Sequence, residues 1–501
     1  MEKNTSSSSS SSSSSAAAHV LIICFPGQGH VTPMLSLAKL LSFSGVFTTF
    51  VNTESIHRRL SSSSDLTDRR RLRFRTVPDP LTGGVDEELG FSSKFINLQE
   101  SMRSCSTEPY KKLLLTEELT GEWPPVTCVI ADGILFYAIE VAGEVGIPTL
   151  VFRTSSLSSS WAYASLRTFM DQGIIPFPEK CDMDEIVKGV EGMEGILRRR
   201  DLPGFMKMVK STEDNYIKII NGINSLLING KALIFNSFDA LDPTLLPIMS
   251  SYYPPIFTIG PLHLLTKFFN ISNEKEQEQE KEPGKNSCSS SLRQEDHACM
   301  TWLDNQPDKS VVYVTFGTVA VMSLEQFTEF WHGLVNSGHR FLWAMREDMV
   351  KGKEEMEVTE ELEEGTKERG CMVEWVPQEE VLAHRAVGCF LTHSGWNSTL
   401  EGMVAGVPMI CFPYFSDQMV NSRFVSEVWR IGLDMKDTCD RNTVERMVRE
   451  AMEGESALEL RNSAARMADL ARKSVEKNGT SCANFERLVS YIKSTALTGS
   501  S

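Results

Sequence analysis

Residues 375–418 read WVPQEEVLAHRAVGCFLTHSGWNSTLEGMVAGVPMICFPYFSDQ, and they are the part of the chain that most clearly indicates the fold class. Short apolar runs at 370–375, 387–392 and 408–413 are each followed by a polar turn and a helical pattern. This alternation is typical of βαβ units built on a parallel sheet. Since open α/β sheets bind ligands at the carboxyl ends of their strands, the polar loops should converge on one site.

The middle loop, His393 to Ser398, leads into a helical pattern that we expect to begin near Thr399. Free N–H groups at a helix N-terminus attract anions, and Gly395 would let the backbone approach one closely. His393 and Ser398 can donate further hydrogen bonds. The loop therefore predicts a phosphate site, with an ordinary helix cap as the alternative.

The other polar residues of the stretch predict a sugar-nucleotide pocket. Trp375 offers a flat face for a base, and Glu401 has oxygens that can accept hydrogen bonds from ribose hydroxyls. Asp417 and Gln418 can bind sugar hydroxyls. Taken singly, a strand-end Trp is more often part of the core, and the three polar residues are more often solvated surface groups.

The stretch resembles the signature box of the plant family 1 UDP-dependent glycosyltransferases, from its opening Trp to its closing Gln. The commonest family pattern has Cys, Pro and Gln-Trp where this chain has Ser394, Arg385 and Tyr414-Phe415, and none of these changes removes a predicted hydrogen bond. The resemblance implies an α/β fold called GT-B, in which two doubly wound, Rossmann-like domains face each other across a cleft. The resemblance implies that Trp375 stacks on uracil, that Gln378 and Glu401 hold the ribose, that His393, Asn397 and Ser398 hold the diphosphate, and that Trp396, Asp417 and Gln418 hold the sugar. Val376, Gly395 and Thr318 are further donor-binding candidates; the Thr318 hydroxyl could stabilise the diphosphate, with an ordinary turn hydroxyl as the alternative.

Composition predicts a soluble enzyme, since 501 residues with 41% hydrophobic content suffice for two domains. The net charge of −16 argues against nucleic acid as a partner, and the arginine clusters at 69–71 and 198–200 are expected to be solvated. The 11 cysteines are scattered without C-x-x-C spacing, which favours free thiols and gives no metal site. We expect a cytoplasmic, monomeric protein without a membrane span, a cofactor or a bound metal.

Patterning divides the chain into five parts. Residues 1–18 are mostly Ser and lack the apolar core of a secretory signal, so they should be a disordered tail. An N-terminal acceptor domain is expected over 19–262, a flexible polar linker over 263–298, and a C-terminal UDP-sugar domain over 299–480. The resemblance implies that a last helix, within 481–501, returns to the N-terminal domain.

His30 follows the first expected strand, and a neutral imidazole there can act as a general base near neutral pH. By itself, a lone His at a helix start more often packs or caps. In the family that the chain resembles, the His at this position is the base, and an Asp after a later strand orients it. Asp132, in the run VIADG, holds that position here.

Two other classes compete with this interpretation. Gly27 and Gly29 after a strand suggest a dinucleotide-dependent dehydrogenase, but Thr32 stands where that fingerprint needs a third Gly. A non-catalytic protein that binds terpenoids or UDP-sugars would be favoured if His30 or Asp132 were missing, and both are present.

The acceptor is expected to be a small hydrophobic plant metabolite. The segments at 132–148, 197–205 and 428–448 resemble a subgroup that includes iridoid glucosyltransferases, which favours a monoterpenoid over a phenolic acceptor. Either a hydroxyl or a carboxyl oxygen can receive the glucose in such enzymes. The aromatic residues that we expect to line the acceptor pocket are Phe136, Trp161, Tyr163 and Phe205.

Overall fold

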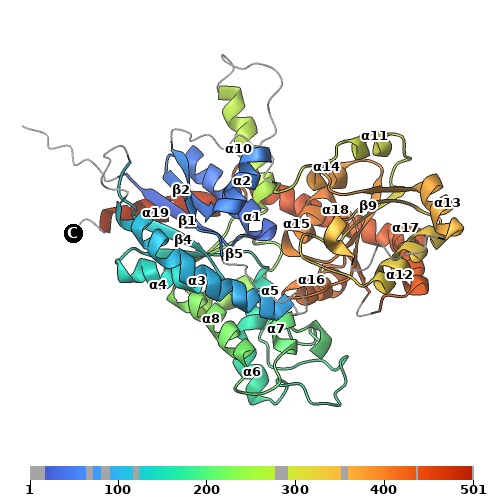
Figure 1. Ribbon diagram of the computed structural model, residues 1–501, viewed down its shortest axis with the longest axis horizontal. Helices are drawn as coiled ribbons and strands as arrows, with labels where there is room; N and C mark the ends of the chain where they lie inside the picture. Colours follow the sequence, from blue (N-terminus) through green and yellow to red (C-terminus); the bar gives the residue numbers. More distant parts are fainter. Residues whose placement is uncertain are drawn as a thin grey trace, which may run out of the picture.

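The computed structural model of the protein describes residues 17–63, 71–80, 91–116, 123–276, 291–350, 359–435 and 438–498. Its strands form two parallel sheets, which lie in the left and right halves of the molecule in Figure 1. The predicted α/β class, with two doubly wound domains, is confirmed. Residues 1–16 of the expected tail and residues 277–290 of the expected linker lie outside the described residues.

The N-terminal sheet has seven strands in the order β3-β2-β1-β4-β5-β6-β7. In β1, Val20 and Ile22 pack on one face while Leu21 and Ile23 pack on the other, because side chains alternate along a strand and helices cover both faces. The strands are β1 (His19–Ile23), β2 (Phe47–Thr53), β3 (Leu72–Val77), β4 (Cys128–Asp132), β5 (Thr149–Arg153), β6 (Leu233–Phe235) and β7 (Ile256–Thr258).

Helices on both faces bury this sheet. The first ten are α1 (Gln28–Phe43), α2 (Glu54–Ser63), α3 (Phe91–Thr116), α4 (Phe136–Glu144), α5 (Leu157–Ala164), α6 (Leu166–Asp171), α7 (Gly204–Lys207), α8 (Asn215–Asn229), α9 (Leu245–Tyr252) and α10 (Leu262–Glu276). Residues of α1, α2 and α10 pack on one face, and residues of α3, α4, α5, α8 and α9 on the other.

The C-terminal sheet has the order β10-β9-β8-β11-β12-β13, again all parallel. Its strands are β8 (Val311–Thr315), β9 (Arg340–Ala344), β10 (Gly370–Val373), β11 (Val387–Thr392), β12 (Met409–Cys411) and β13 (Gly432–Asp434). Its helices are α11 (Ala298–Asp304), α12 (Leu324–Asn336), α13 (Glu360–Arg369), α14 (Gln378–Ala383), α15 (Trp396–Ala405), α16 (Gln418–Arg423), α17 (Arg441–Met452) and α18 (Gly454–Val475).

The last helix, α19 (Thr480–Thr498), lies against the N-terminal domain, where Figure 1 shows it in red behind the blue strands. It contacts β4 and β7, and Phe485, Leu488 and Ile492 join the core on the α1 face of that sheet. The asparagine Asn484 donates to the backbone oxygen of Thr258 at 3.1 Å. The C-terminus therefore ties the two halves of the chain together.

Hydrogen bonds and an ion pair connect the two domains across their interface. The indole N–H of Trp429 donates to the backbone oxygen of Leu241 at 3.3 Å, and the Ser156 hydroxyl donates to Asn421 at 2.8 Å. Arg198 pairs with Asp434 of the other domain at 2.8 Å. These bonds fix the two sheet edges opposite each other.

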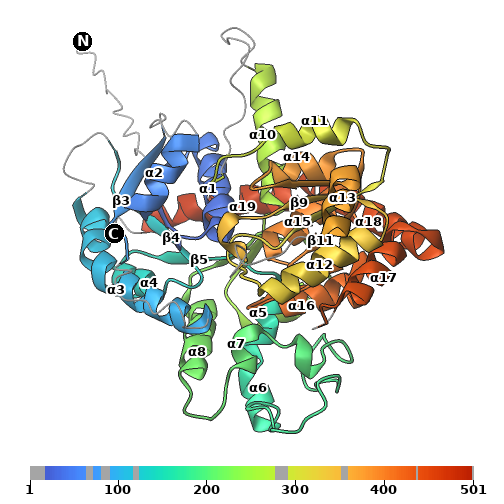
Figure 2. The same cartoon turned by 45° about the vertical axis from the view of Figure 1, so that its right-hand side comes forward.

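Three expectations about the chain need correction. The linker expected over 263–298 begins with helix α10, because Leu262, Leu265 and Phe269 repeat at helical spacing and pack on the N-terminal core. Figure 2 shows this helix beside α14. The strand β13 was not predicted from the sequence, since three residues are too few to show the alternation of apolar and polar side chains that marks a strand. Helix α15 begins at Trp396 and not near Thr399.

The expectation of solvated arginines at 198–200 is wrong for Arg198. Its side chain is only 7% exposed and pairs with Asp201 and Asp434. Asp201 lies three residues further along the chain, but Asp434 comes from β13 of the other domain. Arg198, from a run of arginines, therefore lies in the domain interface.

Candidate active site

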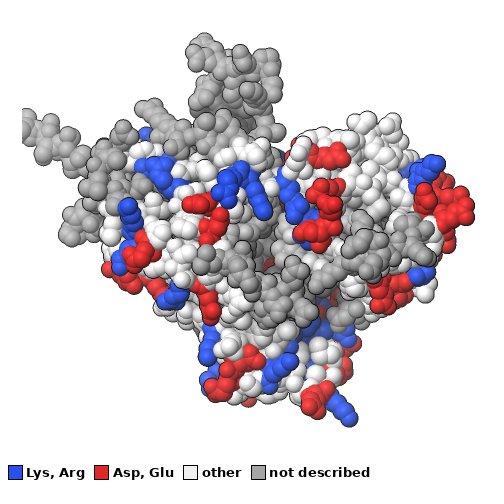
Figure 3. Space-filling view, in the orientation of Figure 1, with Lys and Arg blue, Asp and Glu red and all other residues white. Residues whose placement is uncertain are grey.

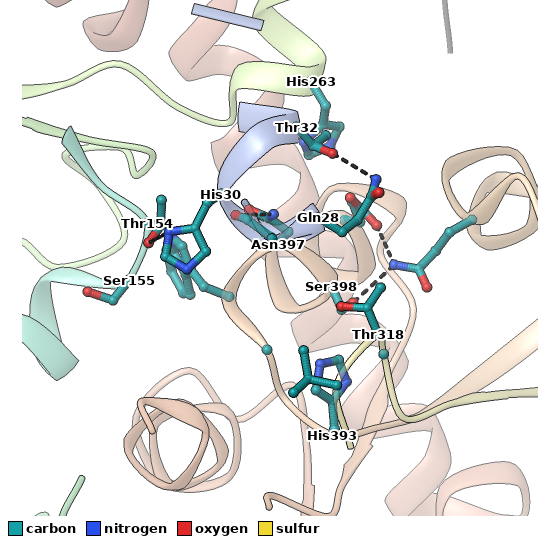
Figure 4. A pocket seen from close by; sticks show the side chains of 18 of the residues that line it. Gln28, His30, Thr32, Thr154, Ser155, His263, Thr318, His393, Asn397 and Ser398 are labelled. Atoms are coloured by element: carbon teal, nitrogen blue, oxygen red, sulfur yellow. Dashed lines mark hydrogen bonds between the residues drawn. The ribbon is translucent and has the colours of Figure 1, made fainter. Parts of the chain in front are cut away.

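A cavity of about 1270 Å³ lies where the carboxyl ends of the two sheets face each other. The loops after β1 and β5 form its N-terminal wall, and the loops after β8, β10, β11 and β12 form its C-terminal wall. Figure 4 shows His30 and Thr154 on one side of this space and Thr318, His393 and Ser398 on the other. The convergence expected from the βαβ pattern is thus present.

His30 lies in the first turn of α1, and its side chain is 23% exposed to the cavity. Its Nδ1 lies 2.8 Å from Oδ2 of Asp132, the last residue of β4, which is fully buried. Because β1 and β4 are neighbours in the sheet, their ends bring the two residues together. The carboxylate also accepts the backbone N–H groups of Phe25 and Ile134, which hold it in place.

With Nδ1 donating to the carboxylate, the other ring nitrogen of His30 keeps its lone pair for the cavity. Thr154, which sequence reasoning missed, lies with its hydroxyl 3.2 Å from the same Nδ1. The only signal for Thr154 was its position directly after a strand, at the edge where ligands bind. The imidazole is therefore oriented from two sides.

The opposite wall carries the N-terminus of α15, with Gly395, Asn397 and Ser398 lining the cavity. The ring of His393 packs between Gly317 and Gly395, at distances where a side chain on either glycine would collide with it. Burial lowers the pKa of His393 to about 4, so the ring is neutral at pH 7. Among the described residues its Nδ1 is buried without a hydrogen-bond partner, which leaves it available to a ligand.

Two further groups of this wall suit the same ligand. Thr318 follows β8 and lines the cavity next to Gly317, whose φ of 73° brings the loop close to His393. Asn397 lines the cavity as well, but its side-chain amide donates to the backbone oxygen of Gly29 at 3.0 Å. Asn397 therefore also joins the two domains across the cleft.

The residues expected around a nucleoside form one connected group. Gln378 accepts from the Tyr313 hydroxyl at 3.0 Å and donates to Ser398 at 3.0 Å and to Glu401 at 2.5 Å. Burial and the nearby Glu379 raise the pKa of Glu401 to about 8. Glu401 is therefore mostly protonated at pH 7.

Trp375 and Val376 lie at the same end of the cavity. The indole N–H of Trp375 donates to the Ser291 hydroxyl at 2.9 Å, and the Arg293 guanidinium lies 5.8 Å from the centre of the indole ring. The ring is fixed in orientation while Trp375 borders the cavity, which suits stacking on a flat base.

The residues expected at the sugar differ in what they can offer. Trp396 is 3% exposed, and its indole N–H donates to the backbone oxygen of Asn236 at 2.9 Å, so its ring belongs to the domain interface. It can contribute a backbone N–H at the start of α15. The Gln418 oxygen accepts the N–H groups of Tyr414 and Phe415, at 2.8 and 3.1 Å, which leaves the amide nitrogen for a ligand.

Asp417 lines the cavity beside Gln418 and accepts from Asn421 at 2.8 Å. Burial raises the pKa of its carboxyl above the usual value, while Asn421, His30 and Arg153 act in the opposite direction. The carboxylate keeps oxygen lone pairs for a hydroxyl group of a ligand.

Only two of the four predicted acceptor residues border the cavity. Tyr163 and Phe205 line it, together with Phe95, Leu98, Ile134 and Ile223, which the sequence did not single out. Phe136 instead packs against Gly222 of α8. Trp161 donates its indole N–H to the Glu191 backbone oxygen at 2.9 Å, and its ring packs at a tilt against Tyr252. The prediction was wrong for Phe136 and Trp161, because the sequence pattern did not show which faces of α4 and α5 turn toward the cavity.

The described ranges offer neither a metal-binding cluster nor a membrane-spanning helix. They contain no group of three or more His, Cys, Asp or Glu side chains arranged to hold a metal ion. No helix within the same ranges is long and apolar enough to cross a membrane. On the face in Figure 3, Lys and Arg side chains are interspersed with Asp and Glu, which does not resemble a surface for nucleic acid.

Comparisons with known proteins agree with this arrangement. The sequence model of the family described as UDP-glucoronosyl and UDP-glucosyl transferase matches residues 286–462. The chain is 47% identical to a myricetin 3-O-rhamnoside 1,2-glucosyltransferase of Crocosmia x crocosmiiflora, over 96% of each chain. It is 44% identical to a 7-deoxyloganetic acid glucosyltransferase of Catharanthus roseus, over 95% of this chain and 97% of the relative. The crystal structure of Os79 from O. sativa in complex with UDP matches 94% of this chain and all of that one, with 28% identity and a TM-score of 0.76.

Proposed function

The chain belongs to the UDP-glucoronosyl and UDP-glucosyl transferase family, and from this premise we propose that it transfers glucose from UDP-glucose to a small plant metabolite. The observation that carries the proposal is the His30–Asp132 pair, which faces the N-terminus of α15 across one cavity. A base on one side and phosphate donors on the other are what a transfer from a sugar nucleotide needs.

In the proposed step, Nε2 of His30 takes the proton of an acceptor hydroxyl while that oxygen attacks C1 of the sugar. The new C1–O bond forms as the bond from C1 to the diphosphate oxygen breaks, and the electron pair leaves with UDP. Asp132 keeps the imidazole in the correct tautomer and stabilises its positive charge, as in a hydrolase triad. A single displacement inverts the configuration at C1.

The leaving diphosphate gains negative charge, and the C-terminal wall can stabilise it. A ring N–H of the neutral His393, the backbone N–H groups at the start of α15 and the Thr318 hydroxyl all border the same part of the cavity. We propose that these groups act without a metal ion. At the other end, Trp375 would stack on uracil, and Gln378 and Glu401 would hold the ribose.

For the acceptor, we favour a monoterpenoid of the iridoid type. Support comes from the 44% identity to the 7-deoxyloganetic acid enzyme and from 37% identity to a 7-deoxyloganetin glucosyltransferase of Catharanthus roseus. The 47% identity to a glucosyltransferase that acts on a flavonoid rhamnoside supports a phenolic acceptor as the second candidate. The apolar acceptor side of the cavity suits either class.

The test is incubation of the purified protein with UDP-glucose and a panel of iridoid, other terpenoid and phenolic acceptors, with products identified by mass. We expect UDP release together with a glucoside of at least one iridoid acceptor. UDP-glucose binding without any product would instead favour a non-catalytic binding protein. Absence of both product and UDP-glucose binding would contradict the proposed function.

A further inference from the structure

Arg153, the last residue of β5, places a buried positive charge in the wall of the acceptor side of the cavity. Arg153 as a whole is only 4% exposed to solvent. The next residue, Thr154, contacts His30, so Arg153 lies at the strand end that borders the proposed base. The proposed transfer step does not use this arginine.

The hydrogen bonds of Arg153 leave its charge without a close counterion. Nη1 donates to the backbone oxygen of Gly133 at 2.7 Å, whereas Nε and Nη2 have only long contacts, of 3.4 Å, with the hydroxyls of Ser160 and Ser155. All three acceptors are neutral. A guanidinium has five N–H donors, so part of its capacity is unused.

Nearby acids do not supply the missing partner. Within the part of the chain that the structure describes, Arg153 forms no ion pair with a carboxylate, and its hydrogen bonds go to Gly133, Ser155 and Ser160. Asp132 and Asp417 attract the guanidinium only from a greater distance, and burial lowers its pKa below the usual value. A buried charge without a paired counterion is costly, which favours a ligand that brings the opposite charge.

A second polar group points to the same ligand. The Tyr163 hydroxyl is buried at the wall of the same cavity, near Ser416 and the Phe205 backbone, without a hydrogen bond of ordinary geometry among the described residues. Its residue is 3% exposed, and it interacts electrostatically with Arg153. Apolar side chains, including Ile134 and Phe205, make up the neighbouring wall.

Resting on the proposed function, we propose that Arg153 and Tyr163 bind a carboxylate of the acceptor. The acceptor is then a hydroxy acid: its carboxylate pairs with the guanidinium and accepts from the phenol, and a separate hydroxyl faces Nε2 of His30. A carboxylate matches the planar donor fork of an arginine, and the pairing is strong where water is excluded. Arg153 thereby selects the acceptor and orients it toward the base.

The experiment compares kcat/KM for an iridoid hydroxy acid and for its methyl ester, which keeps the shape and removes the charge. The parent enzyme should prefer the acid by about 10- to 100-fold, as expected for charge-assisted hydrogen bonds. In Arg153→Met, kcat/KM for the acid should fall about 10- to 100-fold more than kcat/KM for the ester, mainly through KM. Arg153→Lys should lie between, because it keeps the charge and loses the planar fork.

Tyr163→Phe is the matched variant for the phenol, since it removes only the hydroxyl. It should reduce the preference for the acid by a smaller factor than Arg153→Met. Thermal melting and UDP binding of each variant report whether the fold and the donor site are intact. Mild alkaline treatment of the product distinguishes a glucoside, which survives, from a glucosyl ester, which is cleaved.

Several outcomes would overturn the proposal. They are a parent enzyme that uses the ester as well as the acid, a glucosyl ester as the product, an unchanged acid-to-ester ratio in Arg153→Met, and transfer to neutral acceptors only. An unchanged ratio with lower kcat for both substrates would mean that Arg153 merely holds the Gly133 loop. Failure of the proposed function looks different, since neither UDP-glucose binding nor transfer to any acceptor would then be seen.

Discussion

The imidazole of His30 donates its Nδ1 hydrogen to the carboxylate of Asp132 over 2.8 Å, although 102 residues separate the two in the chain. The carboxylate is fully buried, whereas the ring is partly exposed to the cavity. This pairing leaves Nε2 as the only ring nitrogen that can accept a proton from a ligand. The pair is therefore the natural place to test the chemistry.

His30→Ala should lower kcat with a hydroxyl acceptor by about 10² to 10⁴, the usual range for a lost general base. The affinity for UDP-glucose should change little, because the donor-binding groups lie on the opposite wall. Steady-state kinetics and calorimetric titration of UDP-glucose measure the two quantities. Near-normal turnover in this variant would assign His30 a purely structural role.

Asp132→Asn should lower kcat by about 10² to 10⁴ as well, since an amide cannot stabilise the imidazolium that forms during transfer. Thr154→Val is the matched control, because it removes the other neighbour of Nδ1, at 3.2 Å, and leaves the carboxylate in place. It should cost less than tenfold, on the order of one hydrogen bond. Equal losses in the two variants would argue against a special role for the charge of Asp132.

Gln418 should favour glucose over galactose in the donor. The parent enzyme should prefer UDP-glucose in kcat/KM by roughly 5- to 150-fold, because an axial 4-hydroxyl would leave the amide N–H unpaired. Gln418→Ala removes the amide donor without adding a charge beside Asp417, although the N–H groups of Tyr414 and Phe415 then lose their side-chain acceptor. Its preference should fall toward one. A competition assay with both donors would contradict this role if the ratio stayed the same.

Glu401 should make donor binding depend on pH. Its pKa is raised to about 8, so the free enzyme carries mostly the protonated acid at pH 7. If the carboxylate accepts hydrogen bonds from the ribose hydroxyls, UDP-glucose binds the ionised form better. The dissociation constant should then fall as pH rises from 6.5 toward 8.5, by at most about tenfold per unit. Calorimetric titrations should show this trend in the parent and no trend in Glu401→Gln, and a flat parent profile would contradict it.

The buried carboxyl group of Asp242 should lower the free energy of unfolding at high pH. Its carboxyl is buried with Oδ2 unpartnered among the described residues, and burial raises its pKa from the usual 3.8 to about 7. The folded protein therefore holds this proton more tightly than the unfolded chain does. The stabilisation of the fold by the bound proton is full below about pH 4 and is lost as the pH rises through 7. Asp242→Asn, which stays neutral, should be more stable than the parent at pH 8 by about 1 to 3 kcal/mol.

The measurement for Asp242 is denaturant unfolding of both proteins between pH 4 and 8. The difference in the free energy of unfolding should grow from pH 4 to pH 7 and then level off. A difference that does not vary with pH would show that the carboxyl is not buried unpaired in solution.

The features of this protein that depend on local pattern could be predicted from the sequence. The alternation of apolar runs and helical segments set the two parallel sheets, since hydrophobic period and turn residues are read within a few neighbours. The loops after the strands of residues 370–413 carried their polar residues to one edge, as the geometry of parallel strands requires. For this reason every donor residue expected from the motif borders the cavity.

Which partners those residues contact depends on the three-dimensional fold. The indole of Trp396 turns to Asn236 of the other domain, and Arg198 is buried against Asp434, because both contacts join segments that are far apart in the chain. Phe136 and Trp161 belong to helix packing and not to the cavity. Burial, charge pairing and the choice between core and cavity depend on non-local neighbours, which no local sequence pattern specifies. The unpaired charge of Arg153 became visible for the same reason.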